Sequence, residues 1–246
     1  MGRITFANAR VWRYMMNAIG KIVEEAACTF GDEGLRLRAM DPSHVAMIDL
    51  LIPTEAFEEY DVGKGESITF TLEDINKVFR RVGKHDSLTL EWGEGRLAIA
   101  LSGRLERTFR IPMPTIEVSE LPEPKLEFHV KARMLSKNLR EGIKDVEPVA
   151  DVITLTASSE GFKITGRSER GEAQIILTVE SGALLELEVK EESTANYSIE
   201  YLSDTLPAAQ ISDVAEVSFS TNMPCMIRYE LPGGGYLSFI IAPRVE

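Results

Sequence analysis

The stretch IPMPTIEVSELPEPK, Ile111–Lys125, divides this chain into two halves of similar length. Four of its residues are prolines: Pro112, Pro114, Pro122 and Pro124. Proline lacks a backbone donor and pushes the residue before it toward extended geometry, so neither a helix nor a central strand can continue through the stretch. We interpret it as a semi-rigid connector, with domains over 1–110 and 127–246 and the connector over 111–126. Three apolar residues argue against a purely solvated tether: Ile116, Val118 and Leu121.

The composition is that of a globular chain able to bury a sizeable core, with 44% hydrophobic residues. Lys and Arg number 27 against 39 Asp and Glu, and a net charge of −12 would disfavour nucleic acid if it were spread evenly. No signal-like or membrane-spanning apolar run is present, so we expect a soluble intracellular protein that does not contact membranes. Cys28 and Cys225 lie far apart without metal or redox spacing, which favours two buried thiols and no metal or cofactor.

Three stretches combine an apolar stripe at helical spacing with a basic opposite face. They run from Asn8 to about Glu25, over Glu73–Asp86, and near Arg133–Lys144. Their expected inward residues are Val11, Met15, Ala18 and Ile22; Leu72, Ile75, Phe79 and Val82; and Leu135, Leu139, Ile143 and Val146. Their bases are Arg10, Arg13 and Lys21; Lys77, Arg80, Arg81 and Lys84; and Arg133, Lys137, Arg140 and Lys144.

The order of elements before the connector recurs after it. Glu33-Gly34 matches Glu160-Gly161, and Thr71-Leu72-Glu73 matches Ser198-Ile199-Glu200, both at an offset of 127 residues. Strand-like runs surround both matches, and a fourth helix is expected near Ile199–Pro207. The pattern indicates an internal duplication within an α+β protein, with two unrelated α+β domains as the alternative.

Positive charge is concentrated on the three basic helices. Counted over 9–23, 72–84 and 133–144, their balances are +3, +2 and +3, which leaves −20 for the rest of the chain. Like charges at helical spacing repel one another by ~0.2–0.5 kcal/mol per pair, so this arrangement suggests a shared anionic partner whose phosphates the bases would neutralise independently of sequence. The alternative is that these bases pair with acids elsewhere in the fold.

No motif points to catalysis. Asp41, Ser43 and His44 are too close in sequence to form a triad, and a turn explains them better. Gly233-Gly234-Gly235 lacks the ending of a phosphate-binding loop and is expected to form a hairpin turn. The histidines are scattered, without metal-ligand spacing: His44, His85 and His129.

The segment AMDPSHVAMIDL (Ala39–Leu50), the duplication, the proline-bearing connector and the ending FIIAPRVE resemble the proliferating cell nuclear antigen family of DNA sliding clamps, especially its crenarchaeal members. The resemblance covers the whole chain. It implies a ring of three subunits, homotrimeric or built with paralogous subunits, with helices around duplex DNA and antiparallel sheets outside. It also implies a non-enzymatic processivity factor for replication and repair in archaea. The implied partners are a clamp loader, DNA polymerase, flap endonuclease and DNA ligase, the last three through short peptides, and the implied location is the cytoplasm beside the nucleoid.

The resemblance also implies roles for particular residues. The helix bases named above would face DNA without reading sequence. The implied partner-peptide residues are Met40, His44, Val45, Met47, Leu121, Pro122, Pro224, Ile240, Ala242 and Pro243, although Met40 and Met47 could instead be core residues. The implied subunit-interface residues, in the segments Arg104–Ile111 and Glu172–Val179, are Arg107, Phe109, Ile111, Ile175 and Leu177. The fourth helix departs from the family because it carries no base, which leaves open either little DNA contact there or a ring shared with relatives of different charge. An ordinary two-domain nucleic-acid-binding protein remains the alternative function.

Overall fold

The chain, seen in a computed structural model that describes residues 2–63, 65–116 and 121–244, forms two compact units. Val118 of the predicted connector and the last two residues of the ending FIIAPRVE lie outside the described residues. The first unit comprises Met1–Pro42, Ile48–Leu121 and Leu231–Leu237. The second comprises Ser43–Met47, Pro122–Glu230 and Ser238–Glu246.

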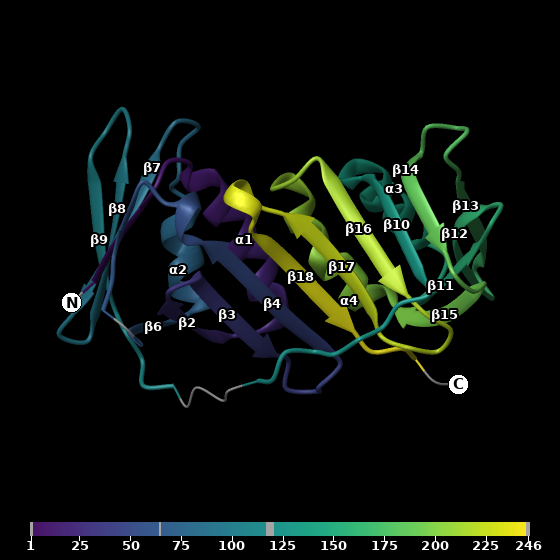
Figure 1. The fold of residues 1–246 in the computed structure, drawn as a ribbon, viewed down its shortest axis with the longest axis horizontal. Coiled ribbons are helices and arrows are strands. Elements are labelled where there is room, and N and C mark those ends of the chain that lie inside the picture. The colour runs from purple at the N-terminus through teal and green to yellow at the C-terminus, as the bar shows by residue number, and fades with distance from the viewer. Residues whose placement is uncertain (1, 64, 117–120, 245–246) are drawn as a thin grey trace. The chain divides into compact units, whose positions relative to one another are not determined.

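The half of the sequence before the connector contains two α-helices among antiparallel strands (Figure 1). In chain order its elements are β1 (Gly2–Phe6), α1 (Ala9–Ile22), β2 (Glu25–Gly31), β3 (Gly34–Met40), β4 (Ala46–Pro53), the 3-10 turn η1 (Thr54–Ala56), β5 (Glu59–Asp61), β6 (Ser67–Thr71), α2 (Leu72–Phe79), β7 (Ser87–Gly93), β8 (Arg96–Ser102) and β9 (Arg107–Pro112). Hydrogen-bonded neighbours follow the order β5-β1-β7-β8-β9 in one layer and β4-β3-β2-β6 in the other.

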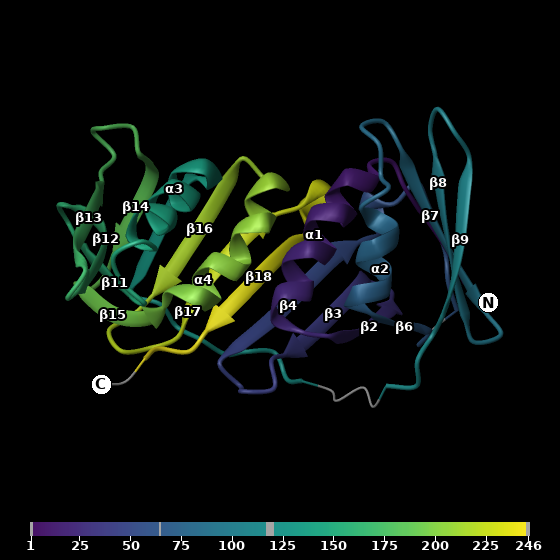
Figure 2. The same ribbon diagram turned by 180° about the vertical axis from the view of Figure 1, so that it is seen from behind.

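The half after the connector repeats this plan. Its elements are β10 (Val130–Leu135), α3 (Ser136–Val146), β11 (Val152–Ser158), β12 (Gly161–Ser168), β13 (Gly171–Leu177), β14 (Leu184–Val189), β15 (Ser193–Ser198), α4 (Ile199–Thr205), η2 (Leu206–Gln210), β16 (Val214–Phe219), β17 (Cys225–Glu230), η3 (Pro232–Gly234) and β18 (Tyr236–Ile241). The strand orders are β14-β10-β16-β17-β18 and β13-β12-β11-β15, which match those of the first half. Figure 2 shows α1 beside α2 and α3 beside α4, each pair on one side of its own unit's strands.

The duplication is confirmed element by element. α1 and α3 begin at Ala9 and Ser136, and α2 and α4 begin at Leu72 and Ile199, all at the predicted offset of 127 residues. β7 and β16 begin at the same separation. The glycines that open β3 and β12 have φ of 124° and 153°, backbone angles that other residues rarely adopt. Two unrelated α+β domains are therefore excluded.

The predicted apolar stripes form the cores. Val11, Met15, Ala18 and Ile22 of α1 are all buried, and the Asn8 side chain caps this helix by accepting from the Arg10 N–H at 3.0 Å. All four predicted inward residues of the second stripe are also buried, at 7% exposure or less. In the third, Leu139, Ile143 and Val146 are buried, whereas Leu135 is half-buried and precedes the helix.

Three predicted helix boundaries are wrong, each for a local reason. α1 ends at Ile22, and Glu25 already pairs with Thr71 in a strand. α2 ends at Phe79 because the chain turns back, with the Gly83 N–H donating to Asp86 Oδ2 at 2.6 Å. The third helix begins only at Ser136, since the residues before it belong to strand β10. Strands β1, β5, β10, β14 and β15 were not anticipated from the sequence pattern.

Candidate nucleic-acid interface

The bases of α1 lie on one face and are held in place by an aromatic ring. Arg10 and Arg13 each place their guanidinium carbon 5.8 Å from the centre of the Tyr14 ring, and Arg10 Nη2 also donates to the Tyr14 hydroxyl at 3.2 Å. Lys21, two turns further along, is exposed. α1 contains three bases and no acid, so its charge balance of +3 is as the sequence indicated. Its solvent face can therefore attract phosphate.

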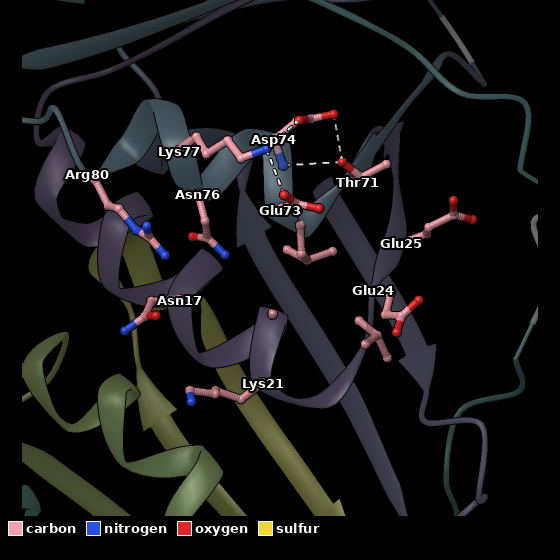
Figure 3. A pocket seen from close by; sticks show the side chains of 13 residues that line it. Asn17, Lys21, Glu24, Glu25, Thr71, Glu73, Asp74, Asn76, Lys77 and Arg80 are labelled. Atoms are coloured by element: carbon pink, nitrogen blue, oxygen red, sulfur yellow. Dashed lines mark hydrogen bonds and ion pairs between the residues drawn. The ribbon is translucent and has the colours of Figure 1, made fainter.

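A groove of about 680 Å³ lies between α1 and α2, and its charges are mixed (Figure 3). Lys77 Nζ lies 2.7 Å from Glu73 Oε1 and 3.5 Å from Asp74 Oδ1, and the hydrogen bond that it donates to Glu73 raises the pKa of Lys77. Two acids thus surround the single base of α2, whose own balance is −1. This corrects the prediction of a basic second helix, because Lys77 is already neutralised locally.

The remaining bases of the second stretch lie beyond α2. Arg80 occupies the C-cap, and Arg81 and Lys84 are exposed in the turn toward β7. In Figure 3 Arg80 projects from the end of α2 and has no drawn interaction with the residues that line the groove. The prediction that all three lie on a helix face is wrong. Their charge is nevertheless available on the surface of unit 1.

Helix α3 presents a row of three exposed bases, Lys137, Arg140 and Lys144. None of the three has an ion pair with any residue that the structure describes. The acids Glu141 and Asp145 lie beside this row on the exposed surface, so the balance of α3 is +1 and not the +3 counted over 133–144. The bases occupy one strip because they are spaced three and four residues apart.

Arg133 is not part of this helical row. It lies on β10, and its guanidinium is 3.5 Å from Glu186 and 3.3 Å from Glu230. The alternating exposure of β10, with Ala132 and Met134 buried, places Arg133 on the opposite face of that strand. Its assignment to a DNA-facing helix is therefore wrong, and for this base the alternative of pairing with acids in the fold is correct.

α4 carries no base in the structure either. Its seven residues include Glu200 and Asp204, which gives a balance of −2. Of the predicted DNA-facing bases, those without an ion pair among the described residues therefore belong to α1, to the turn after α2 and to α3.

The predicted subunit-interface residues lie on the last strands of two sheets. β9 and β13 each have one hydrogen-bonded neighbour within the described residues, and Phe109, Ile111 and Ile175 are half-buried on them. Leu177 is 2% exposed, so it is a core residue and its assignment to a free interface is wrong. Sequence reasoning missed Ile176, which is 54% exposed, because it did not establish which side of β13 faces the core.

Arg107 is also engaged within its own unit. It forms an ion pair with Asp86 and donates to the Arg81 carbonyl at 2.6 Å. Because Asp86 is 5% exposed, this pair ties β9 to the turn after α2. Arg107 therefore supports the edge strand from within its own unit, and its role at a subunit interface stays a prediction.

The predicted partner-peptide residues are distributed over both units. Unit 2 contains His44, Val45, Met47, Pro122, Pro224, Ile240, Ala242 and Pro243, and the Ala242 N–H donates to the Val45 carbonyl at 2.8 Å. Met40 and Leu121 belong to unit 1, and both are half-buried. Met47 and Ile240 are buried at 8% and 9% exposure, so Met47 is mainly a core residue.

The motifs that invited other interpretations are structural. His44 is exposed at a φ of 57° in the turn before β4, whereas Asp41 is 4% exposed. Gly233-Gly234-Gly235 forms the predicted turn between β17 and β18, closed by the Leu231 N–H donating to the Gly235 carbonyl at 2.8 Å. In the part of the chain that the structure describes, no helix has the length and apolar character needed to cross a membrane.

Two family models match almost the entire chain. The N-terminal domain of proliferating cell nuclear antigen matches residues 1–117, and its C-terminal domain matches 122–244. The chain therefore belongs to the proliferating cell nuclear antigen family, the sliding clamps of DNA polymerases.

Relatives across the archaea agree with this assignment. The chain is 46% identical to DNA polymerase sliding clamp 3 of Aeropyrum pernix over 99% of this chain and 98% of that protein. It is 41% identical to the DNA polymerase sliding clamp of Thermofilum pendens over the whole of both. Among solved structures, the PCNA2–PCNA3 complex of Sulfolobus tokodaii matches with a TM-score of 0.93 at 36% identity, covering 99% of this chain and 100% of that chain. The clamp of Thermococcus kodakaraensis matches with a TM-score of 0.94 at 31% identity and the same coverage.

Proposed function

We propose that this chain is a subunit of a ring-shaped clamp that encircles duplex DNA and acts as a processivity factor for DNA polymerase. The observation that carries the proposal is that α1 and α3 carry bases with no ion pair among the described residues, in a chain whose net charge is −12. Such bases bind phosphates without reading sequence and release counterions, which suits a ring that must slide. The proposed role is a tether and not a catalyst, located in the cytoplasm beside the nucleoid.

The rival function is an ordinary nucleic-acid-binding protein that grips one side of the duplex. Loading with a clamp loader onto nicked circular DNA, followed by linearisation, separates the two. A clamp is retained on the circles and lost once free ends are created. Equal retention on both forms of DNA would refute the clamp and favour the rival.

We propose that the ring closes through β9 of one subunit and β13 of the next. Both strands end their sheets, and their outward side chains have opposite charge: Arg110 is exposed on β9 and Glu172 on β13. Exposed Ile176 adds apolar area to the second edge. Because one chain carries both complementary edges, we favour three identical subunits over a mixed ring.

Native mass spectrometry of the purified chain tests this closure. Arg110→Glu and Glu172→Arg should each weaken the trimer, and the double variant should recover it if the two side chains meet across the joint. Thr108→Glu, on the same face of β9, controls for added charge. A wild-type chain that stays monomeric or dimeric at micromolar concentration would count against self-closure and for a ring shared with paralogous subunits.

We further propose that client proteins bind through short peptides at the partner-peptide residues named above, apart from Met47, which is mainly a core residue. A polymerase, a flap endonuclease and a ligase are the proposed clients, and a clamp loader the proposed opener of the ring. The support is the mixture of half-buried apolar side chains and connector prolines among these residues. His44→Ala should lower affinity for a synthetic peptide with a glutamine, an aliphatic residue and two aromatics, while trimer mass stays unchanged. A loss of hydrolytic activity in the same variant would instead support an enzyme.

A further inference from the structure

Two carbonyl groups of the connector accept hydrogen bonds from side chains of unit 1. The four prolines of the connector have no N–H to donate, so side-chain donors from the sheet add attachments at these carbonyls. At its start the Met113 N–H donates to the Gly95 carbonyl at 2.9 Å. The next carbonyl, that of Pro114, accepts from the Thr69 hydroxyl on β6 at 2.6 Å. A side chain of the sheet therefore supplies the donor for this carbonyl.

A second attachment lies near the far end of the connector. Arg38 on β3 donates from Nη1 to the Leu121 carbonyl at 3.5 Å and from Nε to Asp49 Oδ1 at 2.8 Å. The other oxygen of Asp49 accepts from the Tyr236 hydroxyl at 3.0 Å. Asp49 is 4% exposed, and both of its carboxylate oxygens are occupied. A buried carboxylate therefore helps to orient the Arg38 guanidinium that reaches the connector.

We propose that Thr69, Arg38 and Asp49 are positioning residues that hold two described points of the connector, Pro114 and Leu121, in place for peptide binding. This inference rests on the proposed function, because Leu121 belongs to the proposed partner-peptide surface. Thr69 and Arg38 act on the connector directly, at Pro114 and Leu121, and Asp49 acts through Arg38.

The physical reason is preorganisation. A connector held at two carbonyls before a peptide arrives loses little conformational freedom on binding, whereas an unpinned connector must be ordered at that moment. Removing one attachment should raise the dissociation constant for the peptide by about three- to tenfold, the range expected for ordering a short segment. The change should appear mainly as faster dissociation of the peptide.

The attachment at Pro114 allows a matched pair of variants. Thr69→Val keeps the shape and β-branching of threonine but removes the donor, whereas Thr69→Ser keeps a hydroxyl. We expect Thr69→Val to weaken binding of the labelled synthetic peptide described above and Thr69→Ser to retain most of the affinity. Hydrogen exchange of connector amides should rise in Thr69→Val alone. Equal affinity and equal exchange in the two variants would refute the role of Thr69.

The attachment at Leu121 is tested by changing Asp49, the buried partner of Arg38. Asp49→Asn preserves the side-chain volume but removes the charge that holds Arg38. It should lower the affinity for the peptide as much as Arg38→Gln does. The double variant should cost little more than either single change, since both act through one contact. Glu59→Gln is the control, because it breaks an ion pair of similar length in unit 1, 2.8 Å from Arg3, between β5 and β1.

The outcomes separate this inference from the proposed function. If the wild-type chain forms a trimer and binds the peptide, but Thr69→Val and Asp49→Asn bind it equally well, the positioning roles are wrong and the clamp stands. If the wild-type chain does not bind the peptide, the proposed binding of client proteins is wrong instead. Additive losses in the Arg38 and Asp49 double variant would show that the two residues act separately, which contradicts the proposed support.

Discussion

Neutralising the exposed bases of α3 should flatten the salt dependence of DNA binding, and the structure indicates by how much. Lys137, Arg140 and Lys144 have no ion pair among the described residues, so each can neutralise one phosphate. Three lost contacts should reduce the slope of log K against log salt by about 2.7, at roughly 0.9 per phosphate. Alanine is a strong helix former, so the triple variant should leave α3 folded.

Between roughly 50 and 200 mM salt, that slope corresponds to about a 40-fold loss of affinity that the wild type suffers and the triple-alanine variant does not. Fluorescence anisotropy with a labelled duplex, read at several salt concentrations, measures it directly. Trimer mass and thermal unfolding of the variant should match the wild type, because none of the three side chains is buried.

Lys77→Ala is the matched control within the same molecule. Its ammonium is already paired with Glu73 and Asp74, so its removal should change the slope by little. A slope that stays the same in the α3 triple variant would refute the assignment of α3 to DNA. If Lys77→Ala changed the slope by as much as one third of the change in the triple variant, the argument that a locally paired base does not bind phosphate would be refuted.

Three further predictions concern stability and reactivity. Arg107→Ala should lower the free energy of unfolding by about 2–3 kcal/mol, measured by urea denaturation, because the buried Asp86 carboxylate loses its partner; a change below about 0.5 kcal/mol would contradict the support assigned to this pair. Burial raises the pKa of Cys225 to about 12 and also raises the pKa of Cys28, so both thiols stay protonated at neutral and mildly basic pH. Both should therefore resist alkylation at pH 8 until urea unfolds the chain. Rapid labelling of the native protein would show that the thiols are accessible. Gly34→Ala should destabilise unit 1 strongly in thermal unfolding, since its φ is 124° and an added Cβ would lie 2.1 Å from a carbonyl oxygen of β4; an unchanged melting temperature would show that the β2–β3 turn can rearrange.

Periodicity was enough to predict the apolar stripes of the helices, because the spacing of buried residues along a helix is a local property. The offset of 127 residues between matched segments was enough to predict the duplication. Arg133 shows where this approach ends. It lies four residues before Lys137, which is helical spacing, yet the segment that contains it alternates as a strand does. Spacing alone cannot decide between the two when an element boundary falls inside the pattern.

The charge on α2 was misjudged although its cause lies in the sequence. Glu73 and Lys77 are four residues apart, a spacing that places two side chains side by side on a helix, and here they form an ion pair. Counting net charge over a longer window concealed this pair. The exposed Ile176 and the buried Leu177 were not separable in the same way, because the core-facing side of a strand depends on its neighbours.

From its residue order alone, this chain specifies two copies of one α+β plan, a proline connector between them and basic strips on α1 and α3, since each of these depends on spacing of a few residues. Only the tertiary structure decides which bases remain available, which strands end their sheets and what holds the connector. Arg107 meets Asp86 across 21 positions, and Tyr236 meets Asp49 across 187. Contacts between residues so far apart depend on how the strands pair and pack, and no local pattern encodes them.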